Sequence, residues 1–235
     1  MVTLHYFFYI FMKVLVACEH SGRVRDAFKD LGHFAVSCDF KPCHSPGHHY
    51  QGDVRDLLDD EWDLLIGHPP CPYLTHAAMG AYNSPGRHLL RSEAIQFFML
   101  LYNANIKHVC IENPVGIMNR LLPGSIQTIH PWMFGDMAFK RTCLFLKNLP
   151  PLVKTVPNLK NVDKSQLYVR TSASGKPVTW QQDLNRYNRA KCAELRSITF
   201  PGIAHAMATQ WSEYISSSLP GTVRRSPGYS INSYI

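Results

Sequence analysis

KVLVACEHSGRVRDAFKDLG, residues 13–32, decides the fold because it joins a short apolar run to an amphipathic segment. Residues 13–17 are rich in β-branched and aliphatic side chains and predict a strand, which a turn of small and polar residues follows. The second half carries apolar residues at helical spacing, namely Val24, Ala27, Phe28 and Leu31. Gly32 then predicts the end of that helix. The stretch therefore predicts a strand, a turn and a helix in succession.

Three more apolar runs extend this pattern along the chain. They are FAVSCD, WDLLIG and KHVCIENP, at residues 34–39, 62–67 and 107–114. The amphipathic stretch 92–103 precedes the last of them, and parallel strands need such long connections. The sequence predicts an α/β fold, an open sheet with helices on both faces. It contains no internal repeat.

Polar clusters follow each of the four predicted strands. They are Glu19, Ser21 and Gly22 after the first, Asp39 at the end of the second, Pro69 to Cys71 after the third, and Glu112 to Pro114 at the end of the fourth. Open α/β sheets bind ligands beyond the carboxyl ends of their strands. These clusters are therefore the candidate functional residues.

Composition and charge narrow the class of protein. A chain of 235 residues with 46% hydrophobic and 17% charged residues suits one main globular core. The excess of 24 Lys and Arg over 17 Asp and Glu favours a polyanionic partner such as nucleic acid. Seven cysteines without paired spacing indicate free thiols in a reducing cytoplasm. The apolar residues 1–11 are too few to span a bilayer.

Cys71, in GHPPCPYL, is the candidate nucleophile. An isolated cysteine is usually a small buried hydrophobe, and Cys110 and Cys143 in their apolar strands fit that role. Cys71 instead stands in a proline-stiffened loop at a strand end, where a thiolate could attack a ligand.

Glu112, in CIENP, is the candidate acid. It could cap the next turn, or it could be a carboxylic acid with a raised pKa that protonates a ring nitrogen. A cysteine at one strand end and a glutamate at the next suit attack on an electron-poor heterocycle.

IGHPPCPYL followed some forty residues later by IENP resembles the DNA cytosine-5 methyltransferases, and most of all their compact phage-type members. The resemblance runs from Lys13 to Ile215. It implies a Rossmann-like class I methyltransferase open sheet with a small loop-rich target-recognition insert. It also implies that Cys71 attacks C6 of a flipped cytosine, that Glu112 engages N3, and that Arg141 helps to hold the base. A base inside a duplex must be flipped out of its stack for this reaction.

The resemblance and the strand-end positions together nominate the remaining site residues. The cofactor S-adenosylmethionine is expected to contact Cys18, Glu19, Ser21, Gly22, Asp39, Asp53 and Pro69. The substrate is expected to contact Pro70, Arg87, Asn113, Pro114 and Arg170. Asp39 and Asp53 could instead form turns and caps. The first loop keeps only one of the family's glycines, Gly22, and Cys143 replaces the second arginine of the base-binding motif.

Two further segments could face DNA. Residues 75–91 are expected to be a loop that closes over bound DNA, or simply a surface loop. The later segment is basic through Lys154, Lys160, Lys164, Arg170, Lys176, Arg186 and Arg189. A tract with zinc-ligand residue types, namely Cys38, Cys43, His44, His48 and His49, matches no standard finger spacing, so no metal is expected.

The domain prediction has five parts. Residues 1–11 form a leader that could be non-native, 12–150 the catalytic methyltransferase core, 151–196 the basic target-recognition insert, 197–215 a helix that returns to the core, and 216–235 a disordered tail. The predicted function is DNA cytosine-5 methylation in the cytoplasm, as protection of phage DNA from restriction. Double-stranded DNA is the expected partner, with no membrane and no obligate protein partner. The alternatives are an RNA (tRNA) cytosine-5 methyltransferase and a catalytically silent DNA-binding relative.

Overall fold

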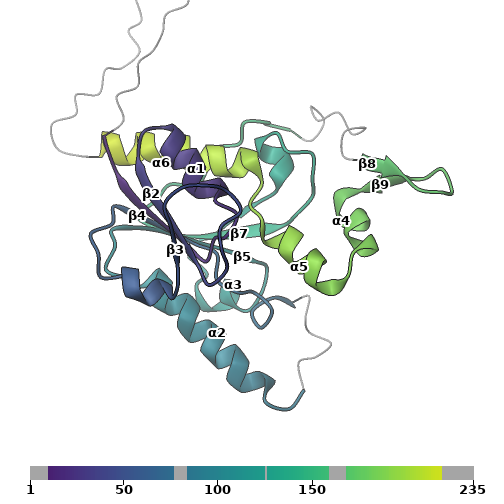
Figure 1. The fold of residues 1–235 in the computed structure, drawn as a ribbon, viewed down its shortest axis with the longest axis horizontal. Coiled ribbons are helices and arrows are strands. Elements are labelled where there is room, and N and C mark those ends of the chain that lie inside the picture. Colours follow the sequence, from purple (N-terminus) through teal and green to yellow (C-terminus); the bar gives the residue numbers. More distant parts are fainter. Residues whose placement is uncertain (1–9, 77–83, 125, 159–167, 219–235) are drawn as a thin grey trace, which may run out of the picture.

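A seven-stranded open sheet forms the centre of the protein in the computed structural model, which describes residues 10–76, 84–124, 126–158 and 168–218 (Figure 1). Its strand order is β3-β2-β1-β4-β5-β7-β6. The strands are β1 (Lys13–Ala17), β2 (Phe34–Asp39), β3 (His49–Gln51), β4 (Leu64–Gly67), β5 (His108–Pro114), β6 (Ile126–Ile129) and β7 (Thr142–Lys147). The first five are parallel, and β7 runs antiparallel to both of its neighbours. The predicted α/β open sheet is confirmed.

Helices cover both faces of this sheet. The helices α1 (Arg23–Asp30) and α6 (Pro201–Ser217) lie on one face, and α2 (Arg87–Tyr102) lies on the other with the short α3 (Met118–Leu121) (Figure 1). Successive strand residues alternate between the faces, so Val14 and Val16 join the first apolar cluster while Leu15 joins the second. The sheet is therefore buried on both sides, as expected for parallel strands.

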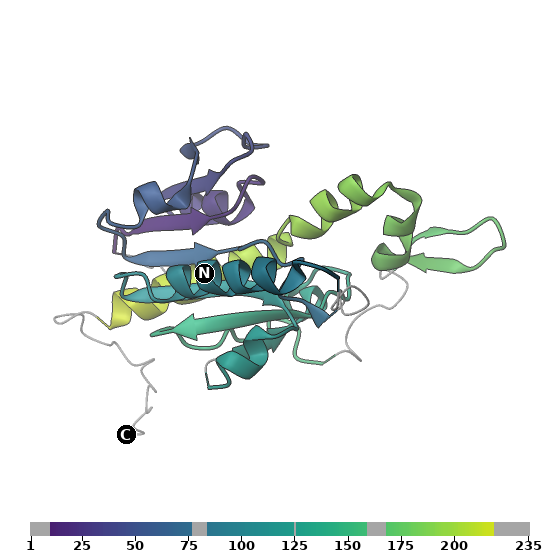
Figure 2. The same cartoon turned by 90° about the horizontal axis from the view of Figure 1, so that it is seen from below.

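The segment expected to be a loop-rich insert contains regular structure. It includes a hairpin of β8 (Tyr168–Thr171) and β9 (Pro177–Thr179), followed by α4 (Trp180–Asp183), the 3-10 turn η6 (Leu184–Arg186) and α5 (Arg189–Ser197). Figure 2 shows this hairpin projecting away from the sheet. Residues 159–167, with Lys160 and Lys164, lie outside the described residues, and the domain boundaries stay a prediction.

Two helix ends differ from those expected from the sequence. The helix α2 begins at Arg87, so the last five residues of the expected loop 75–91 are helical, whereas residues 77–83 lie outside the described residues. The expected tail starts at residue 216, which is two residues too early, because α6 continues through Ser217. Ser216 is buried and its Oγ accepts a hydrogen bond from the Ile10 backbone N–H at 3.1 Å. The rest of that tail, residues 219–235, and leader residues 1–9 are not described.

No helix in the described part of the chain is long and apolar enough to cross a membrane.

Candidate active site

The strands β4 and β5 bring the two candidate catalytic residues to one edge of the sheet. They are parallel neighbours, with Gly67 opposite Ile111. Their carboxyl ends therefore meet, and the HPPC loop after β4 lies beside the end of β5. Cys71 follows β4, and Glu112 lies near the end of β5.

The cysteine loop is fixed to the end of β5 by short contacts. The Asn113 amide donates to the Pro69 carbonyl at 3.3 Å, and the Ile117 N–H donates to the Leu74 carbonyl at 2.9 Å. Gly116 lies so close that a Cβ built there would stand 1.9 Å from the Leu74 oxygen. Only glycine fits this approach, so the loop position depends on Gly116.

The Cys71 thiol is half-buried beside a charged pair. Burial raises the pKa of Cys71, and the negative charge of Glu112 raises it further, while Lys140 and Arg196 act in the opposite direction. The resting side chain is therefore a thiol, which must lose a proton before it becomes a strong nucleophile.

Glu112 is ionised in the structure. Burial alone would raise the pKa of Glu112, but the charge of Lys140, together with the neighbouring His68 and Thr142, outweighs burial and holds that pKa at about 2. Lys140 Nζ lies 3.9 Å from Oε1, and His68 Nδ1 lies 3.5 Å from Oε2. The raised pKa that the sequence suggested for Glu112 is therefore wrong, because a partner lysine lies beside the carboxylate.

Lys140 is the residue that the sequence analysis missed. The expected contact was Arg141, but Arg141 is exposed, and the adjacent Lys140 faces Glu112. The register explains this, because Pro114 pairs with Thr142 in the antiparallel β5–β7 ladder. Even-numbered residues of β7 thus share the face of Glu112, and residues with odd numbers lie opposite. Lys140 also donates to the Arg196 carbonyl at 2.8 Å, which joins the end of α5 to the site.

Two solved structures resemble this fold. They are the S. pombe Dnmt2 methyltransferase, with 14% identity and a TM-score of 0.41, and the Entamoeba histolytica methyltransferase EhMeth, with 12% identity and a TM-score of 0.39. Each match covers 74% of this chain, and this chain spans 59% and 60% of the respective proteins. No family model and no curated protein matches the chain. The strand order itself, with β7 reversed, is the Rossmann-like class I methyltransferase sheet that was expected.

The first loop differs from the expected cofactor loop. Glu19 accepts hydrogen bonds from the backbone N–H groups of Val24 and Arg25 at 2.8 and 3.2 Å, and from the Ser21 hydroxyl. Its carboxylate thus caps the start of α1, and the contact with a cofactor that was expected of Glu19 stays a prediction. Gly22 has a φ of +74°, and a Cβ there would lie 2.2 Å from Ser45 Oγ, so its role is close packing.

Arg25 explains why the β2–β3 loop packs on this helix. Its guanidinium is fully buried and donates to Ser37, Cys43, Ser45 and the Pro46 carbonyl. Removing it would leave these acceptors without a donor.

The other cofactor candidates gather at the ends of β1 and β2. Asp39 is half-buried, and Oδ2 lies 3.8 Å from Nδ1 of the buried His20. Burial raises the pKa of Cys18 to about 12, and the charges of Asp39 and Asp53 add to this effect. Asp53 caps the 3-10 turn η1 (Val54–Leu57), because its side chain accepts a hydrogen bond from the Arg55 N–H. Capping is the alternative role that the sequence suggested for Asp53.

The candidate substrate residues are not all free to bind. Arg87 donates to the Pro72 carbonyl at 3.0 Å and lies over the Tyr73 ring, so it braces the cysteine loop. Arg170 pairs with the buried Asp183 at the base of the β8–β9 hairpin. Pro70 is exposed beside Cys71, and Pro114 ends β5.

The zinc-ligand residue types after β2 have other partners. His49 hydrogen-bonds Ser37 Oγ and the Lys41 carbonyl, and Cys38 is buried. Within the described ranges, no three His, Cys, Asp or Glu residues stand together as a metal site.

Proposed function

We propose that the chain transfers a methyl group from S-adenosylmethionine to C5 of a flipped cytosine in double-stranded DNA. The observation that carries the proposal is the pairing of the Cys71 thiol with the ionised Glu112 at neighbouring strand ends, with Lys140 beside the carboxylate. A nucleophile and a carboxylate that can hold a protonated ring nitrogen at one edge suit addition across the 5,6 double bond of a pyrimidine.

Both pKa shifts disfavour direct transfer of the Cys71 proton to Glu112, because the thiol is a weaker acid and the carboxylate a weaker base than usual. Cys71 therefore loses its proton to solvent and forms the bond from Sγ to C6, while N3 takes up one proton and donates a hydrogen bond to the Glu112 carboxylate. The electron pair of the 5,6 double bond then becomes available at C5. When bound, S-adenosylmethionine supplies the electrophilic methyl group. Loss of the C5 proton to solvent and departure of Cys71 Sγ as a thiolate restore the 5,6 double bond. The proton on N3 is returned and the thiol is re-formed, so that one proton is released to solvent for each methyl group transferred. Lys140 balances the negative charge on Glu112 when it is not protonated.

The residues at the sheet edge fit a nucleoside cofactor. Asp39, at the end of β2, has a carboxylate that can accept from ribose hydroxyls. Glu19 occupies amides of α1 that a phosphate-binding loop would leave open, which disfavours a dinucleotide. His68 and Asn113 each have buried polar side-chain atoms that make no hydrogen bond within the described residues. A polar ligand at this edge would satisfy them.

The basic charge and the projecting hairpin support duplex DNA as the partner. The chain carries an excess of seven positive charges. A two-stranded ribbon such as β8–β9 has the width that the major groove admits. The pairing of Arg170 with Asp183 gives that ribbon a fixed base. Methylation of this kind would mask phage DNA from restriction.

The decisive test is trapping of a Cys71 adduct. A duplex with 5-fluorocytosine lacks the C5 proton needed for release, so the wild-type protein should form a covalent complex, seen as a band stable to denaturation. Cys71→Ala should form none and should transfer no labelled methyl group. Cys192→Ala, a half-buried cysteine on α5, is the matched control and should behave as wild type.

Parallel assays on DNA and tRNA distinguish the two nucleic acids. If the labelled methyl group appears in tRNA and not in DNA, the substrate is tRNA. Full methyl transfer by Cys71→Ala would remove covalent catalysis from the proposal.

A further inference from the structure

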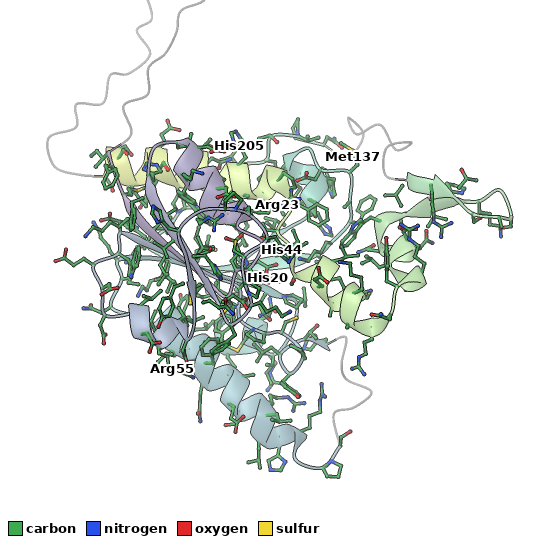
Figure 3. All side chains as sticks on the ribbon, viewed as in Figure 1. His20, Arg23, His44, Arg55, Met137 and His205 are labelled. Carbon is green, nitrogen blue, oxygen red and sulfur yellow. The ribbon has the colours of Figure 1, made fainter. Side chains whose placement is uncertain are left out.

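We propose that an oxyanion-binding site lies in the cleft between the β2–β3 loop and the start of α5. The cleft has a volume of about 620 Å³, and its polar lining comprises His20, Lys41, His44, Asn188, Lys191 and Glu194. His20 and His44 lie side by side where the sheet faces α5 (Figure 3). None of these residues belongs to the Cys71–Glu112 pair.

His20 is a buried polar group that lacks a partner. Its side chain is 8% exposed and lines the cleft. Nδ1 faces Asp39 at 3.8 Å, and the His44 ring packs against it edge-on, with 4.7 Å between the ring centroids. Nε2 makes no hydrogen bond with any residue that the structure describes. A buried ring nitrogen without a partner is costly, and a ligand in the cleft would relieve this cost.

The start of α5 adds positive character to the cleft. Asn188 caps the helix by accepting from the Lys191 N–H at 2.9 Å, and the first turn contains no acidic residue. The amides of Arg189 and Ala190 precede the first helical hydrogen bond and point out of the helix end. Such a helix end attracts anions.

Two cations, Lys41 and Lys191, stand at the cleft with two carboxylates, Glu194 and the Asp39 that faces His20. Lys191 pairs with Glu194 at 2.9 Å, so these two charges largely cancel. Lys41 is exposed at the rim and has no ion pair among the described residues. Lys41, the α5 amides and His20, with its ring proton on Nε2, can each donate to a ligand with one negative charge and several acceptor oxygens, which is a phosphodiester or a carboxylate.

The other end of α5 lies beside Lys140, so the length of this helix indicates how far the cleft is from the Cys71–Glu112 pair. The Arg196 carbonyl accepts from Lys140, which faces Glu112. Eight residues separate Asn188 from Arg196, a length of about 12 Å along a helix. A phosphate one or two nucleotides from the flipped base could reach this site, and so could the carboxylate at the amino-acid end of the cofactor. This pair of sources rests on the proposed function, whereas the anion site itself does not.

Binding measurements on Lys41→Gln separate the two sources. The matched control is Lys107→Gln, which removes the same charge at the amino end of β5, on the opposite edge of the sheet. The probes are S-adenosylhomocysteine, 5′-methylthioadenosine, which lacks the carboxylate, and a short DNA duplex, all titrated by calorimetry. Loss of one charge-assisted hydrogen bond should weaken binding by roughly tenfold or more.

A carboxylate in the cleft predicts weaker S-adenosylhomocysteine binding and unchanged binding of methylthioadenosine and duplex. A phosphodiester predicts weaker duplex binding and a salt slope reduced by about one, with both nucleosides unchanged. In either case the nitrogen resonances of His20 should shift when that ligand is added, and His20→Phe should weaken the same ligand. Equal affinities in Lys41→Gln and Lys107→Gln for every probe would overturn the site. If these binding effects are found but the wild-type protein transfers no methyl group, the proposed function alone is wrong and the anion site stands.

Discussion

Lys140 determines the charge of Glu112, and this single contact changes what the acid can do. An isolated buried carboxyl holds its proton, as the sequence suggested, but the ammonium 3.9 Å away stabilises the carboxylate. Glu112 therefore starts as a carboxylate that accepts hydrogen bonds and has little basicity. Between the two residues the chain forms α3, β6 and the 3-10 turn at Pro131–Phe134, so only the β5–β7 register reveals the contact.

Replacing Lys140 should raise the pKa of Glu112. In Lys140→Gln, burial would no longer be opposed by the ammonium, so the pKa of Glu112 should move from about 2 to the ordinary value of about 4.3 or above. Carbon NMR of the labelled glutamate carboxyl measures this shift, and the rate of adduct formation should begin to fall at a higher pH than in the wild type. Lys140→Arg should restore most of the wild-type behaviour. An unchanged titration in Lys140→Gln would show that Lys140 does not control Glu112.

The same shift affects stability with a definite sign. Because the folded pKa of Glu112 lies below its unfolded value, ionised Glu112 contributes free energy of unfolding above about pH 4.3. That contribution is lost as the pH falls towards about 2. The wild type should therefore lose stability over this range more steeply than Lys140→Gln.

The residue types at strand ends predicted which residues meet at one edge of the sheet. They did not predict which partner each of those residues binds. Cys71 and Glu112 stand at adjacent strand ends because apolar runs of β type lead into them. Glu19 and Arg170, in contrast, bind other parts of the protein, a helix start and a buried aspartate. Local sequence does not show which donors fold back on a carboxylate, so these roles could not be read from it.

Among the elements, the loop after β4 and the end of β5 act as one unit. The close approach of Gly116 to the Leu74 carbonyl and the bridge between Thr75 and Gly116 hold them together. Any side chain at Gly116 must push the cysteine loop away from Glu112. Positioning errors of this size reduce catalysis strongly.

Gly116→Ala should reduce methyl transfer by roughly a hundredfold. The new Cβ would stand 1.9 Å from the Leu74 oxygen, so the loop carrying Cys71 must move. The rate of 5-fluorocytosine adduct formation and the melting temperature should both be measured. Gly124→Ala is the control, since nothing lies within 4 Å of a Cβ there, and it should keep the wild-type rate. A Gly116→Ala protein with an undiminished rate would refute this account of the loop.

The strands that could be recognised from the sequence are the buried ones. The runs at β1, β2, β4 and β5 are apolar and bounded by turns, so their positions were predictable. The strand β3, His49–Gln51, is short and partly exposed, and it carries no apolar pattern. The order of strands and the reversal of β7 depend on pairings between distant segments, which periodicity does not contain.

At the scale of the whole molecule, α5 connects the two ligand-facing regions. Its start lines the cleft beside His20, and its end contacts Lys140. A shift of this helix would alter both places, so binding in the cleft and the position of Lys140 should be coupled.

The hydrogen bond between Ile10 and Ser216 brings the start of β1 and the end of α6 to the same corner of the molecule (Figure 1). A short glycine-serine linker could therefore join Ser217 to Ile10, and a new start could be opened at the Gly124 turn, giving a circularly permuted protein. Such a rearranged chain should refold cooperatively and still form the fluorocytosine adduct, as denaturant titration and gel assays would show. The point at which the chain begins would then matter less to this protein than the meeting of its strand ends.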